Sequence, residues 1–155
     1  MTEHNRDFLS DPELEESLLS TIMEGSVKVR SLFPEHFTHG LRRRLYELLR
    51  DGTPYVDLAP ALKLEGIPDD ELAYVTDIYM CPTLPRKEVP EAVANLKRLE
   101  ALRRLCEAVD VWRVKAPHLE VEKAVKGLRG VLGAFEASLP PRSPPVLIGQ
   151  GTRGR

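Results

Sequence analysis

The sequence predicts an all-α protein, in which a small orthogonal helical cluster is followed by an antiparallel helical hairpin. Apolar residues make up 42% of the 155 residues, enough for a hydrophobic core. They are mostly Leu, Val and Ala, aromatic residues are only 6%, and the period-two alternation typical of strands is missing. Proline-containing stretches then divide the chain into a disordered N-terminus (1–9), a helical globular subdomain (10–80), a helical hairpin (84–137) and a proline- and glycine-rich linker or tail (138–155).

The first helix is predicted from its capping residues. Ser10 or Asp11 is suited to the N-cap and Pro12 to the first turn, while Gly25 is suited to the end of the helix. Its apolar stripe consists of Leu14, Leu18, Ile22 and Met23. We expect a short second helix at about Ser26–Leu32.

Another helix is predicted within residues 32–58. Its apolar stripe has the helical spacing i, i+4, i+7 and i+8 and consists of Leu41, Leu45, Leu48 and Leu49. Arg42, Arg43 and Arg44 are expected on the opposite face. Gly52 is expected to end this helix and Asp57 to cap the next one.

Two short helices are predicted to complete the cluster. The first carries Leu58 and Leu62 on its inner face and ends near Gly66, and the second begins at Pro68-Asp69.

The hairpin is predicted from two longer patterns. Residues 87–113 carry apolar residues at spacings of three and four, the stretch 114–118 reverses the chain, and the next helix has a seam that repeats at 4, 3, 4 and 3. Glycines 127, 130 and 133 are expected to let another helix approach closely. A two-helix hairpin buries little surface by itself, so we expect its faces to pack on the N-terminal cluster, on a second subunit in a homo-oligomer, or on both. The expected interface residues are Leu96, Leu99, Cys106, Val109, Trp112, Val121, Val125, Leu128, Leu132 and Phe135.

The residues needed for catalysis or cofactor binding do not occur in a recognisable pattern. There is no phosphate loop ending in Gly-Lys-Ser/Thr, and His36 and His39 with Glu35 are too few to form a zinc site. We therefore expect no enzyme, metal, cofactor or small-molecule substrate. Cys81 and Cys106 lack CxxC spacing, and no apolar run is long enough for a membrane span or signal peptide, which predicts a cytoplasmic protein with reduced thiols.

The basic residues allow a second hypothesis. Arg42, Arg43 and Arg44 form a candidate nucleic-acid contact, and residues 101–155 carry ten bases against five acids. The net charge of the whole chain is only −2, however. Basic residues on amphipathic helices also commonly form a solvated face, so both interpretations stay open.

Four short segments, in the same order and spacing, resemble the N-terminal domain of DnaB-type replicative helicases. Glu13–Met23 is similar to that family's first helix, Pro34–Phe37 to its L-x-P-E-D-F motif, Arg42–Tyr46 to its H-R-x-I-F motif, and Val56-Asp57 to its P-V-D motif. Glu100–Leu105 resembles the arginine-bearing helix that begins the family's hairpin, so the similarity extends over about residues 11–135.

The resemblance implies a collar domain that pairs subunits through hairpins and docks a primase or a helicase loader. The chain departs from the family at His36, Arg42 and Ser20, which stand where aspartate, histidine and glycine are usual. A motor with its phosphate loop is absent, so ATPase activity is not implied. The helicase-binding domain of DnaG-type primases is similar too, although the proline-rich segment after Leu139 is of the kind that leads to a motor.

Overall fold

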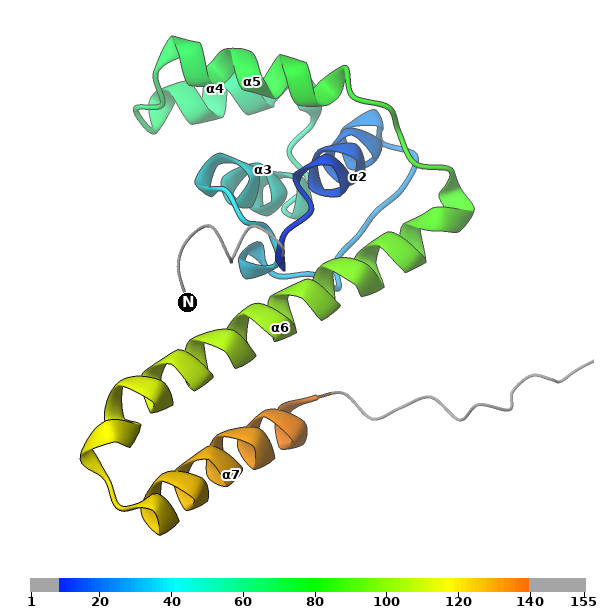
Figure 1. Ribbon diagram of the computed structural model, residues 1–155. Coiled ribbons are helices and arrows are strands. Elements are labelled where there is room, and N and C mark those ends of the chain that lie inside the picture. Colours follow the sequence, from blue (N-terminus) through cyan, green and yellow to red (C-terminus); the bar gives the residue numbers. More distant parts are fainter. Residues whose placement is uncertain (1–8, 140–155) are drawn as a thin grey trace, which may run out of the picture. The chain divides into compact units, whose positions relative to one another are not determined.

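The computed structural model describes residues 9–139 of the chain (Figure 1). This part contains six α-helices and no strands, which confirms the predicted fold class. The helices are α2 (Pro12–Glu24), α3 (Gly40–Arg50), α4 (Tyr55–Leu64), α5 (Asp69–Tyr79), α6 (Val89–Lys115) and α7 (Val121–Ser138), with three short 3-10 helices, η2 (Pro34–His36), η3 (Arg86–Glu88) and η4 (Ala116–His118). The predictions for residues 1–8 and 140–155 lie outside the described residues.

The chain forms two compact units, Met1–Glu107 and Ala108–Arg155. Helices α2 to α5 and most of α6 belong to the first unit, while the end of α6, η4 and α7 form the second. The division therefore falls inside α6 rather than at the predicted break at residues 81–83. The reason is that Val89, Ala92, Leu96 and Leu99 are buried in the first unit.

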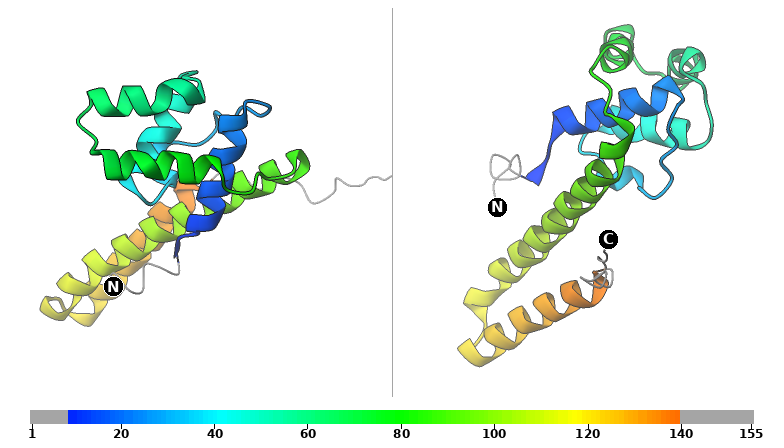
Figure 2. Two further views of the ribbon diagram at one scale, coloured as in Figure 1. Left: turned by 90° about the horizontal axis from the view of Figure 1, so that it is seen from above. Right: turned by 90° about the vertical axis from the view of Figure 1, so that its right-hand side faces the viewer.

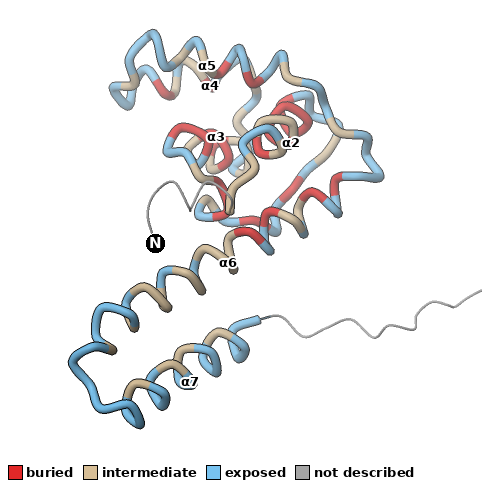
Figure 3. The backbone as a smooth tube through the Cα atoms, in the orientation of Figure 1, coloured by how far each residue is buried: buried red, intermediate tan, exposed pale blue. Residues whose placement is uncertain are grey.

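The hydrophobic core lies inside the first unit. Helix α2 packs against α3 and α5, and α4 packs against α5. Figure 2 shows α2 and α3 running steeply across α4 and α5. Phe37 and Tyr46 are fully buried at the centre with their rings stacked 4.9 Å apart between centroids. Figure 3 shows the buried residues on these helices, on the connection after α2 and on the first half of α6.

The predicted helix ends agree with the structure at several caps. The Asp11 carboxylate accepts a hydrogen bond from the Leu14 backbone N–H at 3.1 Å, so Asp11 is the N-cap of α2. Gly25 ends α2 with φ of +91°, a conformation that glycine adopts without a steric penalty. The expected cap at Asp57 is wrong, because α4 begins at Tyr55 after Pro54 and Asp57 lies in its first turn.

The second helix predicted at Ser26–Leu32 is also wrong. These residues form a helix-free connection between α2 and η2, in which Val29 and Leu32 are buried while Lys28 and Arg30 are exposed. The Tyr46 hydroxyl lies 2.9 Å from the Val29 carbonyl oxygen and also contacts the Leu32 carbonyl. The Tyr46 hydroxyl, which has one hydrogen to donate, thus connects this segment to α3.

The connection between α5 and η3 is fastened to α2 by two buried hydroxyls. The Ser20 hydroxyl lies 2.9 Å from the Cys81 carbonyl oxygen and 3.1 Å from that of Tyr79. The Thr21 hydroxyl accepts a hydrogen bond from the Leu84 backbone N–H at 2.8 Å. Serine at position 20 thus supplies a donor that glycine lacks.

Candidate interaction surfaces

A buried ion pair joins α2 to α3 at the centre of the first unit. Glu15 is fully buried, and Arg42 is only 8% exposed. The Arg42 Nε donates to Glu15 Oε1 at 2.8 Å, and the same carboxylate accepts from the Thr38 backbone N–H at 2.9 Å and the Thr38 hydroxyl at 2.8 Å. Three donors therefore satisfy the buried charge, as a carboxylate without water requires.

Tyr74 of α5 extends this network. Its hydroxyl accepts from Arg42 Nη1 at 2.8 Å and donates to the Glu16 carboxylate. Burial is the main cause that raises the pKa of Tyr74, and its bond to Glu16 acts in the same direction. Burial alone would lower the pKa of Arg42, but Tyr74 and Glu15 outweigh it and the pKa is raised. Three helices are thereby linked by hydrogen bonds that involve charged groups.

The three consecutive arginines do not form the single basic face that the sequence suggested. Arg42 is buried against Glu15 and is not available to a nucleic acid. Arg43 is exposed, and its Nε donates to the Phe37 carbonyl oxygen at 2.7 Å. Arg44 is partly exposed and pairs with Glu65 of the segment after α4, with 2.6 Å between Nη2 and Oε2.

Each arginine thus has an intramolecular partner, which weakens the nucleic-acid hypothesis at this face. For Arg42 that hypothesis is wrong, since phosphate contact needs an accessible guanidinium. The signal that places Arg42 inside is its spacing, because Leu45 and Tyr46 stand three and four residues later on the buried side. Sequence reasoning missed Glu15 as well, although Leu18 and Leu19 follow it at the same spacings.

The second unit is a short hairpin closed by Trp112. The indole Nε1 donates to the Ala124 carbonyl oxygen at 2.8 Å across the turn. A Cβ atom added to Gly127 would lie 3.4 Å from Trp112 Cδ1, an ordinary van der Waals distance, so this contact does not require the glycine that was expected to allow a close approach. Gly130 and Gly133 have no such neighbour within 4 Å.

The apolar seam of α7 stays largely uncovered. No described residue of the second unit is buried. Val121 is 79% exposed, Val125 42% and Leu132 40%, while Leu128 and Phe135 are half-buried. The seam is therefore an apolar stripe without a matching core in its own unit.

The predicted interface residues on α6 divide between the two units. Leu96 and Leu99 are 1% and 6% exposed inside the first unit, so their assignment to an exposed interface is wrong. Their sequence spacing fits a core residue as well as an interface residue. Because they are buried in the first unit, they are not accessible to a partner. Cys106 is half-buried near the end of that unit, and Val109 and Trp112 are half-buried in the second.

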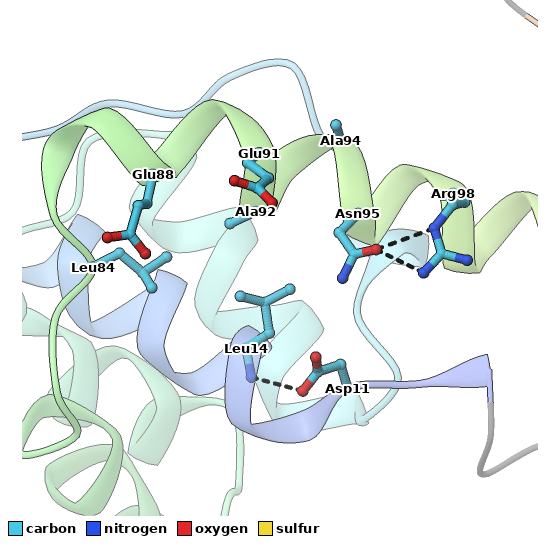
Figure 4. Close-up of a pocket in the computed structure, with 9 residues that line it drawn as sticks. All are labelled: Asp11, Leu14, Leu84, Glu88, Glu91, Ala92, Ala94, Asn95 and Arg98. Carbon is cyan, nitrogen blue, oxygen red and sulfur yellow. Dashed lines mark hydrogen bonds between the residues drawn. The ribbon is translucent and has the colours of Figure 1, made fainter.

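Two hollows of opposite charge lie beside the start of α6. One has a volume of about 460 Å³, and Figure 4 shows the carboxylates of Asp11, Glu88 and Glu91 around it. The other has a volume of about 590 Å³ and lies between α6 and the connection after α2. Its charged residues are Lys28, Arg30 and Lys97.

His36 has a structural role in the η2 turn. It is buried, and its Nδ1 accepts from the Phe33 backbone N–H at 2.8 Å. Burial lowers the pKa of the imidazole, against a raising effect of the Phe33 carbonyl. Within residues 9–139, no three His, Cys, Asp or Glu side chains are grouped so that they could hold a metal ion.

Cys81 and Cys106 are both free thiols. Burial raises the pKa of the Cys81 thiol, which therefore stays protonated more readily than an exposed one. In the same described range, no helix combines the length and apolar character that crossing a membrane would need.

Comparison with known proteins adds no relative. No protein-family model, curated protein or solved structure matches this chain.

Proposed function

We propose that this protein is a non-enzymatic interaction and oligomerisation module of DNA replication, comparable to the N-terminal collar domain of DnaB-type helicases. The observation that carries the proposal is the uncovered apolar seam of α7. Its members Val121, Val125 and Leu132 keep 79%, 42% and 40% of their surface exposed. Stripes of this kind mark protein interfaces rather than solvated faces.

The energy available from this seam is sufficient for weak pairing. Full burial of a Val or Leu side chain contributes about 1.5–3 kcal/mol, so covering a residue that is about 40% exposed contributes roughly 1 kcal/mol. Repetition of the seam over two heptads brings equivalent residues of two copies together. The expected partner is therefore a second hairpin, and the paired subunits would present a composite surface to a primase or a helicase loader.

The ordered resemblance at Glu13–Met23, Pro34–Phe37 and Val56-Asp57 supports assignment to replication. The helicase-binding domain of a DnaG-type primase is the alternative, because it shares the same helical arrangement. The two assignments differ in partner: a collar domain binds a primase, whereas a primase domain binds the helicase collar. Two cysteines without a disulfide fit a reducing compartment, and we place the protein in the cytoplasm.

Light scattering coupled to size-exclusion chromatography tests the oligomer. The mass should rise from monomer to dimer or higher between low and high micromolar concentration. Val125→Asp combined with Leu132→Asp should give a monomer, because it places charge in the seam. Lys123→Asp, at an exposed position on the opposite face of the same helix, should leave the mass unchanged. A wild-type protein that is monomeric throughout would overturn pairing through α7.

A further inference from the structure

The basic hollow beside α6 combines an apolar floor with a cationic rim. Val29 and Val89 of its floor are 7% and 6% exposed, and Val93 is half-buried against the same core. The side chains of Lys28, Arg30 and Lys97 stand at its rim and are exposed. A hollow of 590 Å³ with this composition has room for one or two apolar side chains of a ligand.

The charge of the hollow is of one sign. Among its lining residues are three cations and no acid. Within the described part of the chain, none of Lys28, Arg30 and Lys97 forms an ion pair with a carboxylate. The other hollow beside the start of α6 is lined by the carboxylates of Asp11, Glu88 and Glu91 and by the cation Arg98. The positive field is therefore local to this hollow, and it selects negatively charged ligands.

The backbone beside the hollow is also open to a peptide. From Val27 to Ser31 the connection has no helix, and its N–H groups donate no hydrogen bond to another described residue. Burial alternates along it, with Val29 inside and Lys28 and Arg30 outside. Such a segment is able to pair with an extended chain while its alternate side chains meet the ligand.

We propose that this hollow binds an acidic peptide segment of a partner protein. An apolar side chain of the segment rests on Val29, Val89 and Val93, and its carboxylates pair with Lys28, Arg30 and Lys97. Single-stranded nucleic acid fits less well, because no aromatic side chain lines the hollow to stack on a base. The site is separate from the α7 seam and does not depend on the proposed oligomer.

Selection from a phage-displayed library of random 12-residue peptides on the immobilised full chain tests the proposal. The enriched sequences should contain Asp or Glu together with Leu, Ile, Val or Phe. A synthetic peptide of the enriched sequence, labelled with fluorescein, should bind about tenfold more weakly to the variant Lys28→Glu/Arg30→Glu/Lys97→Glu. In backbone amide spectra, the peptide should shift the signals of residues 28–31 and 89–97.

A control variant, Lys63→Glu/Lys123→Glu/Lys126→Glu, changes the net charge equally at exposed positions outside the hollow. It should bind the peptide as the wild type does, and far-UV circular dichroism should show that both variants are folded. Enrichment of basic or neutral peptides, an absence of enrichment, or equal loss in the control would each overturn the proposal. The proposal would also be overturned if the selection enriched no acidic peptides and the variant Lys28→Glu/Arg30→Glu/Lys97→Glu lost self-association. That result would identify a second copy of the chain as the occupant of the hollow.

Discussion

Replacement of Glu15 by glutamine is expected to destabilise the protein by about 3 kcal/mol. Breaking a buried ion pair by removing one partner costs about 3–5 kcal/mol, since the remaining charge is left uncompensated. Glutamine keeps one oxygen that can accept from Thr38, so the loss should lie at the lower end. The Arg42 side chain is 10% exposed and keeps Tyr74 and Thr38 as partners, which prevents a larger effect.

Urea unfolding followed by far-UV circular dichroism measures this loss. A slope of about 1–3 kcal/mol per molar urea converts about 3 kcal/mol into a fall of the midpoint by about 1–3 M. Arg42→Met alone should cost a similar amount, because it leaves the Glu15 carboxylate without its cation. The double variant Glu15→Leu/Arg42→Met should lose much less than the sum of the single variants. A Glu15→Gln protein within 1 kcal/mol of wild type would refute the view that this pair holds α2 and α3 together.

Two further predictions concern His36 and Trp112. Burial lowers the pKa of His36, so the stability it contributes is complete above its usual pKa and is lost as the pH falls below it. Between about pH 7 and about pH 5 the urea midpoint should fall more in wild type than in His36→Asn, and an equal fall would contradict this assignment. Trp112 is the only tryptophan and lies in the unit without a buried described residue. Its fluorescence should therefore change at a lower urea concentration than the far-UV circular dichroism signal of the helices. The difference between the two midpoints should shrink as protein concentration rises. Coincident midpoints would show that the two units unfold as one cooperative unit and would contradict this prediction.

Helix boundaries were predictable where a local chemical requirement decides them. Asp11 caps a helix because its carboxylate reaches a backbone N–H three residues later, and Gly25, Gly52 and Gly66 all adopt positive φ. Pro68 is the N-cap of α5, at the expected start. Such signals depend on a few neighbouring residues and need no knowledge of the tertiary fold.

Features that depend on distant contacts were missed. The connection at Ser26–Leu32 has no helix, and the hydroxyl of Tyr46 on α3 lies 2.9 Å from the Val29 carbonyl oxygen and 3.1 Å from that of Leu32. Glu15 and Arg42 are acceptable inside only because each compensates the other, and neither sequence position alone shows this. In the sequence, Glu15 and Arg42 each stand on an otherwise apolar helix face. This pattern indicates a buried ion pair only when the faces of α2 and α3 are considered together.

Helix α6 contributes residues to both units, and this limits the surface of the second unit on which an interface can form. Because Leu96 and Leu99 are taken by the core of the first unit, the apolar residues of α6 left to the second unit are Val109 and the half-buried Trp112, with Val111 and Val114 exposed. Helix α7 offers five seam residues, and so small a surface on α6 leaves three of them at least 40% exposed. Covering them requires apolar surface from outside the described unit. A pairing surface should accordingly be sought along α7 itself, and substitutions at Leu96 should affect the stability of the first unit rather than the association of subunits.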